Sequence, residues 1–137
     1  MKPTICIAAA VIIRADGKAL LVRERGTKAF MQPGGKIEPD ESPASALLRE
    51  LIEEIGLHVS VEDLRSLGYF EAPAANEPGH TVSADVFLIE SGNAQITNSA
   101  EIEELCWIDP EEPGDIAMAE LTEHHILPAY MQKRAGG

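Results

Sequence analysis

The segment GKIEPDESPASALLRELIEEIGL, from Gly35 to Leu57, decides how this 137-residue chain is interpreted. It places Glu50, Glu53 and Glu54 within about one and a half turns of a predicted helix. Because an α-helix advances about 100° per residue, the three carboxylates fit within an arc of about 100°. Like charges four residues apart destabilise a helix by about 0.2–0.5 kcal/mol, so a positive partner is expected over them. Clustered carboxylate oxygens suit Mg²⁺ or Mn²⁺.

The same segment resembles the Nudix box, which reads G-x5-E-x7-R-E-U-x-E-E-x-G-U, where U is a bulky aliphatic residue. Every specified position of that pattern is matched at the same spacing. The matching residues are Gly35, Glu41, Arg49, Glu50, Leu51, Glu53, Glu54, Gly56 and Leu57. The turn Pro33-Gly34-Gly35-Lys36 before the box and Trp107-Ile108 further along are also similar to the family.

The resemblance implies one Nudix hydrolase domain over residues 1–137, with the box at 35–57. The implied fold is an α/β Nudix α/β/α sandwich, in which a mixed sheet lies between helices. The implied activity is metal-dependent hydrolysis of a phosphoanhydride bond in a nucleoside diphosphate linked to another moiety, with Mg²⁺ as cofactor and Mn²⁺ as an alternative. The short chain and the PGGK turn resemble members that hydrolyse nucleoside triphosphates.

Two other functions stay open. Pro73 lies 16 positions after Leu57, a spacing that resembles the ADP-ribose pyrophosphatase subgroup, so an ADP-ribose or nucleotide-sugar pyrophosphatase is the alternative enzyme. A non-catalytic Nudix-fold regulator that binds nucleotides is the alternative of another class. Loss of a box glutamate or of the arginine would favour that regulator, and here the whole set is present.

By match to the motif, the expected metal ligands are Glu50, Glu53 and Glu54, with the backbone of Gly35 as a further ligand. Arg49 belongs to the implied catalytic set with Glu50 and Glu53. We expect it to orient a glutamate through a salt bridge rather than to touch substrate. The alternative to metal binding is that the glutamates form an ordinary solvated face of the helix.

The general base is expected either in the box or in a later loop. Glu50 is the candidate in the box. Glu101 is the preferred candidate outside it, with Glu103 and Glu104 as rivals, because all three precede Trp107, where the family often places such a residue. Each of the three is also compatible with an ordinary surface charge.

Residues around the glycine turn are candidates for substrate contacts. Arg23 and Lys36 could neutralise a phosphate, although either could be a surface charge. Phe30, Met31 and Gln32 precede the turn and could line a base pocket, with core packing the preferred role for Met31.

The composition agrees with a small enzyme. The formal net charge of −12 disfavours nucleic acid and anionic membranes as partners, and metal would be needed before a nucleotide could approach. There is no run of 18 apolar residues, so no membrane span is expected. Cys6 and Cys106 are predicted to be reduced and buried. We expect a cytoplasmic enzyme with a small-molecule nucleotide substrate, and a homodimer is an open alternative to a monomer.

Periodicity and turn residues predict alternating strands and helices. A helix is expected from Pro43 to Ile55, capped by Ser42 and Gly56, with its glutamates turned outward, toward a cleft. Its buried apolar stripe is expected to comprise Leu47, Leu48, Leu51, Ile52 and Ile55. A second helical pattern covers 116–133 and is expected to break near Pro128. Strands are expected over 5–14, 19–23, 81–89 and 105–108, around 67–70 and more weakly at 36–38, while 26–30, 33–35, 72–79 and 91–99 are expected to lack regular structure.

Overall fold

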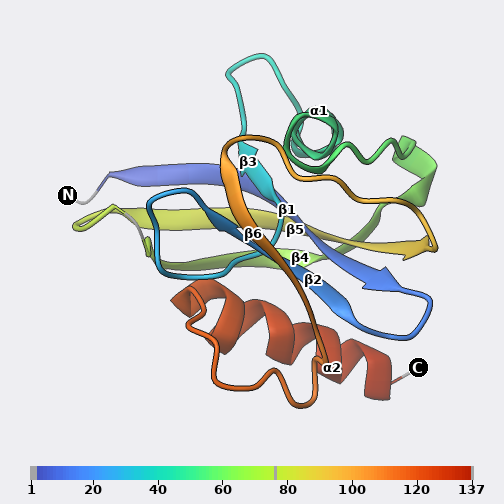
Figure 1. The fold of residues 1–137 in the computed structure, drawn as a ribbon. Helices are drawn as coiled ribbons and strands as arrows, with labels where there is room; N and C mark the ends of the chain where they lie inside the picture. Colours follow the sequence, from blue (N-terminus) through green and yellow to red (C-terminus); the bar gives the residue numbers. More distant parts are fainter. Residues whose placement is uncertain (1–2, 76, 137) are drawn as a thin grey trace.

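A computed structural model of the protein describes residues 3–75 and 77–136 (Figure 1). Its regular elements are, in chain order, β1 (Thr4–Arg14), β2 (Ala19–Glu24), β3 (Gly34–Lys36), α1 (Pro43–Ile55), the 3₁₀ turn η1 (Val61–Asp63), β4 (Arg65–Pro73), β5 (Thr81–Gly92), β6 (Ile102–Ile108), the π-helical turn η2 (Thr122–Ile126) and α2 (Leu127–Ala135).

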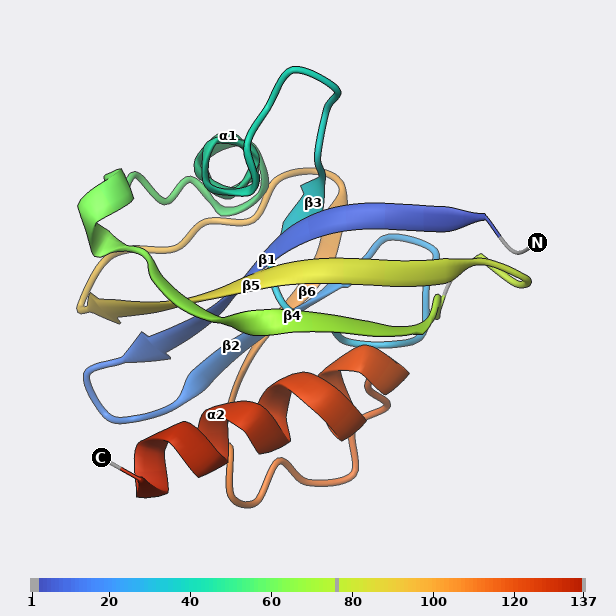
Figure 2. The same ribbon diagram turned by 180° about the vertical axis from the view of Figure 1, so that it is seen from behind.

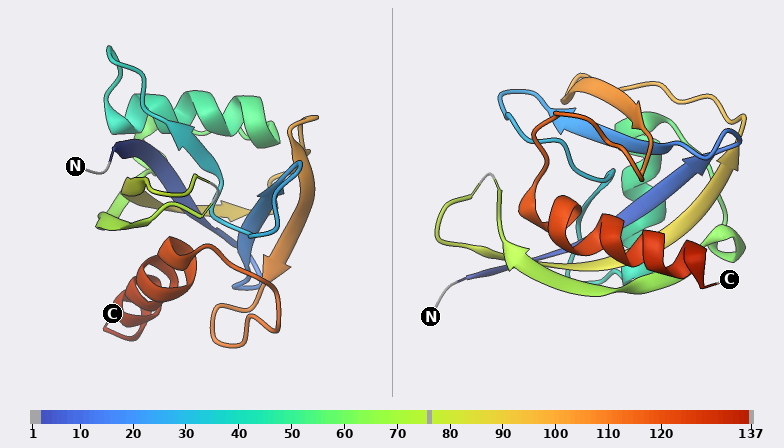
Figure 3. Two further views of the ribbon diagram at one scale, coloured as in Figure 1. Left: turned by 90° about the vertical axis from the view of Figure 1, so that its left-hand side faces the viewer. Right: turned by 90° about the horizontal axis from the view of Figure 1, so that it is seen from below.

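The strands form one mixed sheet with α1 on one face and α2 on the other (Figures 1 and 2). The strand order is β4-β5-β1-β2-β6, and β3 pairs with β1 beside β2. Alternate side chains of β1 pack in two separate hydrophobic cores. Ile12 packs on the α1 side, while Val11 and Ile13 pack on the α2 side. The end-on view in Figure 3 shows the three layers. The predicted α/β/α sandwich is confirmed.

Strand β1 is the centre of the sheet and positions the glycine turn. It runs parallel to β5 on one side, and on the other it pairs antiparallel with β2 and β3. Gly34 crosses β1 so closely that an added Cβ would collide with the carbonyl of Ala8, and its φ of +149° is also one that side chains disfavour. Only glycine therefore lets β3 lie directly against the sheet.

Helix α1 begins and ends where the sequence predicts. The Ser42 hydroxyl accepts a hydrogen bond from the Ser45 amide, and Gly56 closes the helix in the left-handed conformation at φ 65°. Leu47, Leu51 and Ile55 are fully buried. The expected apolar stripe is narrower than predicted, because Ile52 is 44% exposed.

Three expectations about local structure are wrong. The Pro33-Gly34-Gly35 turn was expected to lack regular structure, but Gly34 and Gly35 belong to β3. Strands β4, β5 and β6 extend beyond the ranges expected for them, because pairing with neighbouring strands recruits polar residues at their ends. Neither thiol is in a disulfide, as predicted, but Cys6 is exposed and Cys106 is only half-buried.

The C-terminal helix also departs from expectation. It begins near Glu120 instead of Ile116, and it continues through Pro128 into α2 without a break. The preceding turn is π-helical, with the Leu127 amide donating to the Thr122 carbonyl five residues back. Because proline has no N–H to donate, the wider turn lets the helix pass it without an interior kink.

Candidate active site

Strand β3 and helix α1 bring the glycine turn against Glu50. A Cβ on Gly35 would lie within 2.7 Å of both carboxylate oxygens of Glu50. The absence of a side chain at Gly35 is therefore what gives Glu50 room. Burial raises the pKa of Glu50, while Arg49 opposes the rise and the charges of Glu53 and Glu101 add to it.

Arg49 joins three carboxylates. Its guanidinium donates to both oxygens of Glu41, at 2.6 and 2.8 Å. Its Nη1 donates to Glu50 at 3.0 Å and to Glu53 at 3.4 Å, and Nη2 donates to the carbonyl of Lys36 at 3.2 Å. The expected salt bridge to a box glutamate is present, and it orients Glu50 against β3. The fork on Glu41 is bidentate, and it holds the pKa of that carboxyl to about 2.

Glu54 occupies the most desolvated position of the three glutamates expected to bind metal, Glu50, Glu53 and Glu54. Its Oε1 accepts a hydrogen bond from the Gly34 amide at 3.1 Å. Burial, reinforced by the charges of Glu24, Glu50 and Glu101, raises the pKa of Glu54 to about 8 against that hydrogen bond. The helix was expected to turn its glutamates outward, toward a cleft, and Glu54 faces β3.

The remaining box glutamate, Glu53, is 60% exposed and reaches only Arg49. Across residues 3–75 and 77–136, no three His, Cys, Asp or Glu side chains are gathered closely enough to hold a metal ion. The site nevertheless fits a divalent cation by its chemistry, since its donors are hard carboxylate oxygens and two of them, on Glu50 and Glu54, are partly desolvated. Glu50 and Glu54 with Glu53 would hold such an ion beside Gly35.

The segment before β6 delivers a further carboxylate. Two backbone hydrogen bonds tie this segment to the end of α1, from Thr97 to the Ile55 carbonyl and from Ser99 to the Glu54 carbonyl, both at 3.0 Å. They satisfy carbonyls that a helix end leaves unpaired. Glu101 follows directly, and its charge acts on both Glu50 and Glu54.

The rivals of Glu101 are occupied elsewhere. Glu103 pairs with Arg25 at 2.6 Å, and Glu104 pairs with Arg23 at 3.3 Å. Among the described residues, Glu101 has no side-chain hydrogen bond or ion pair. These pairings favour Glu101, the candidate already preferred outside the box, and its role as the general base stays a prediction.

Glu24, at the end of β2, was not singled out from the sequence. It lines the cavity described below, and its charge raises the pKa of Glu54. A signal was present: alternation along a strand puts Glu24 on the same face as Val22, and Val22 packs in the core beneath α1.

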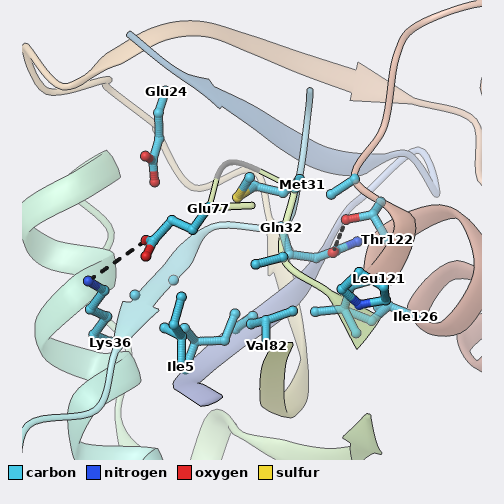
Figure 4. A pocket seen from close by; sticks show the side chains of 18 residues that line it. Ile5, Glu24, Met31, Gln32, Lys36, Glu77, Val82, Leu121, Thr122 and Ile126 are labelled. Atoms are coloured by element: carbon cyan, nitrogen blue, oxygen red, sulfur yellow. Dashed lines mark hydrogen bonds and ion pairs between the residues drawn. The ribbon is translucent and has the colours of Figure 1, made fainter. Parts of the chain in front are cut away.

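A cavity of about 290 Å³ opens on the other side of Gly34 and Gly35 from α1 (Figure 4). Its walls are mostly apolar. The side chains include Ile5, Ile7, Met31, Pro73, Val82, Leu121 and Ile126, together with the polar residues Glu24, Gln32, Lys36, Glu77 and Thr122. At its mouth, the Lys36 ammonium lies 3.9 Å from a Glu77 carboxylate oxygen.

The predicted substrate contacts fall in different places. Lys36, Met31 and Gln32 line the cavity, while Phe30 is buried in the core on the α2 side of the sheet. Arg23 does not line it, because its guanidinium donates to the Thr27 carbonyl at 2.8 Å and to Glu104. A phosphate-binding role for Arg23 stays a prediction that would require this pairing to open.

Comparison with known proteins decides the family. The model of the NUDIX domain matches residues 4–130. The chain belongs to the Nudix family. It is therefore a Nudix hydrolase, an enzyme of the pyrophosphohydrolase type, and Nudix hydrolases generally use divalent metal ions.

Individual relatives cover nearly the whole chain. A protein of Escherichia coli K12 named CTP pyrophosphohydrolase is 31% identical, over 92% of this chain and 91% of its own length. An ADP-ribose pyrophosphatase of Methanocaldococcus jannaschii is 30% identical, over 91% of this chain and 72% of its own. The solution structure of the E. coli ORF135 protein superposes with a TM-score of 0.77 at 28% identity, over 98% of this chain and 94% of that one.

No helix in the described part of this Nudix hydrolase is long and apolar enough to cross a membrane.

Proposed function

We propose that this Nudix hydrolase is a divalent-metal-dependent pyrophosphohydrolase of nucleoside triphosphates, releasing the nucleoside monophosphate and pyrophosphate. One observation carries the proposal: Gly34 and Gly35 separate an apolar cavity from a cluster of glutamates. The cavity suits a nucleobase, since small-molecule sites are concave and mostly apolar with a few polar groups. The glutamates suit metal and phosphate.

The proposed path of the nucleotide follows β3. The base enters the cavity, and the phosphates pass over Gly34, Gly35 and Lys36 toward Glu50 and Glu54. Lys36 exchanges its exposed Glu77 partner, 3.9 Å away, for a phosphate oxygen. That exchange is inexpensive, because exposed ion pairs are worth about 0–1 kcal/mol.

Glu50, Glu53 and Glu54 with the Gly35 carbonyl would hold a divalent cation, which would neutralise phosphate charge and acidify water. Glu101 accepts the proton of the attacking water. The water oxygen forms a bond to phosphorus as one phosphoanhydride P–O bond breaks, and pyrophosphate leaves with the electron pair of that bond. Arg49 holds Glu50 in place and does not touch the substrate.

A second substrate class is favoured by one specific observation. Pro73, whose spacing from Leu57 resembles the ADP-ribose subgroup, lines the cavity, and one relative is named an ADP-ribose pyrophosphatase. With ADP-ribose, the same site would cleave the bond between the two phosphates. The products then distinguish the classes, because ADP-ribose yields two monophosphates and no pyrophosphate.

The test is a substrate panel at fixed Mg²⁺, covering the nucleoside triphosphates, ADP-ribose, nucleotide sugars and dinucleoside polyphosphates. Products are read by anion-exchange chromatography. We expect pyrophosphate release from at least one triphosphate, loss of that release in EDTA, and recovery with Mg²⁺ or Mn²⁺. Activity that survives EDTA would refute the metal dependence, and turnover of ADP-ribose alone would refute the triphosphate assignment. Absence of turnover with every compound would favour a regulator that only binds nucleotides.

A further inference from the structure

One hydrogen bond stands out inside the apolar cavity. Thr122 Oγ1, on η2, donates to Gln32 Oε1, between β2 and β3, at 2.8 Å (Figure 4). Gln32 is 6% exposed and Thr122 1%. Of the described residues, the only other buried polar side chain is Ser83, which does not line the cavity. Buried polar groups are costly unless paired, so this pair has a specific place in the site.

The hydrogen bond leaves half of the Gln32 carboxamide unused. Oε1 accepts from Thr122, and among the described residues no hydrogen bond involves Nε2. Every fully buried side-chain nitrogen or oxygen in the same part of the chain has a partner. Nε2 is therefore not fully enclosed by protein, and Gln32 is one of the residues that line the cavity. Its two N–H groups have no partner among the described residues.

Other polar side chains of the cavity lie apart from this pair. Figure 4 shows Lys36 and Glu77 on the opposite side, and Glu24 also away from Thr122. The neighbours of Thr122 in the cavity wall, Leu121 and Ile126, are apolar. A ligand group that reaches this end therefore meets a hydrogen-bond donor in an apolar wall.

We propose that Gln32, held by Thr122, selects the nucleobase, and that it selects a base with an exocyclic carbonyl oxygen over adenine. The inference rests on the proposed function, since it takes the cavity as the place of the base. Guanine, uracil and cytosine each carry such an oxygen, and adenine carries none.

The selection follows from how a carboxamide pairs. Glutamine recognises adenine through two bonds, accepting from the 6-amino group and donating to a ring nitrogen. Thr122 occupies Oε1 and fixes the side chain, so the acceptor half is no longer aligned for that pairing. A carbonyl oxygen instead accepts directly from Nε2. A ligand that leaves a buried donor unpaired loses affinity by about tenfold to a hundredfold.

The experiment is isothermal titration of the full chain with GMP, UMP, CMP and AMP at fixed Mg²⁺. The parent protein should bind the tightest of the three carbonyl-bearing nucleotides at least about tenfold more tightly than AMP. Equal or tighter binding of AMP would overturn the proposal.

Three variants assign the selection to the pair. Gln32→Leu should weaken the carbonyl-bearing nucleotides about tenfold and should not weaken AMP, because it also removes the donor that AMP leaves unpaired. Thr122→Val, which keeps the volume and removes the hydroxyl, should narrow the preference by freeing Oε1 for adenine. Gln32→Glu, which replaces the donor by an acceptor, should shift the preference toward AMP. This variant tests the proposal if Gln32→Leu does not fold. Unchanged affinity ratios in folded Gln32 variants would overturn the proposal.

Ser83→Ala is the matched control, because it removes a buried hydroxyl away from the cavity wall. It should leave all four affinities in their original ratio, and an equal change in Ser83→Ala and Thr122→Val would overturn the assignment to the pair. Binding is measured without hydrolysis. Selection through Gln32 in a protein that hydrolyses nothing would therefore refute the proposed activity alone. Hydrolysis with selectivity independent of Gln32 would refute this inference alone.

Discussion

Replacing Glu54 by glutamine should raise the stability of the metal-free protein while removing its activity. Glutamine keeps the volume of the side chain and an oxygen that accepts the hydrogen bond from the Gly34 amide. It removes the negative charge, which the metal needs and which the metal-free protein holds in a poorly solvated place. The two effects have opposite signs, so one substitution separates the ligand role from a purely structural one.

The magnitude follows from the pKa of Glu54, which burial raises from 4.5 to about 8. The folded protein then binds the proton more tightly than the unfolded chain does. Its free energy of unfolding is therefore highest below about pH 4.5, falls as the pH rises through about 8, and is constant above that. The difference between the two pKa values corresponds to about 5 kcal/mol. Glu54 is not completely buried, and solvent screening of its carboxylate reduces this to about 2 kcal/mol.

The assay is thermal unfolding in EDTA at pH 5 and pH 9. At pH 5 the parent and Glu54→Gln should melt close together, because Glu54 is protonated in the folded parent. At pH 9 the variant should melt roughly 5 to 10 °C higher. In Mg²⁺, the variant should lose about a hundredfold or more in kcat, because a metal ligand contributes several kcal/mol to the transition state.

Glu53→Gln is the control. Its side chain is 60% exposed, so its charge is solvated and its removal should give no gain in melting temperature at pH 9. Equal melting temperatures for parent and Glu54→Gln at pH 9 would refute the reasoning about a desolvated charge. A kcat at the parental level would refute the ligand role.

Three further predictions concern the same cluster. Glu101→Ala should lower kcat more than it raises KM, with a stability change within about 0.5 kcal/mol. Glu103→Ala and Glu104→Ala should leave kcat unchanged. Steady-state kinetics on the three variants tests this, and the general base would be assigned to Glu50 if none of them had a lowered kcat. Gly35→Ala should lower kcat by more than about tenfold and destabilise the fold by about 1–3 kcal/mol, measured by kinetics and chemical denaturation, because the new methyl group displaces the Glu50 carboxylate. Mg²⁺ should raise the melting temperature more at pH 8 than at pH 6, since metal must displace a proton from the site at the lower pH, and equal shifts at the two pH values would contradict this.

Local chemistry explains what could be read from the sequence. The helix from Pro43 to Ile55 was predictable to the residue, because Ser42 and Gly56 act within one turn of its ends. The C-terminal helix was not, because its start near Glu120 and its passage through Pro128 depend on packing against the sheet and on a π-helical turn, for which the sequence has no short-range signal.

The candidate site likewise has features that the local sequence predicts and features that only the fold determines. Spacing alone placed Glu50, Glu53 and Glu54 on one arc of a helix, but an arc of about 100° does not make the carboxylates equivalent. The carboxylates differ because different groups face them. Glu54 lies against β3, while Glu50 and Glu53 accept hydrogen bonds from Arg49. The segment before β6 places the charge of Glu101 near Glu54.

The hydrogen bond behind the specificity proposal could not be predicted from the local sequence. Gln32 and Thr122 are 90 residues apart, and each is unremarkable in its own segment. Their pairing exists because the segment between β2 and β3 passes the start of the C-terminal helix on the α2 side of the sheet. The glutamates proposed to bind metal could therefore be named from a motif that ends within one helix. The groups proposed to recognise the substrate became visible only when the fold brought two distant segments together.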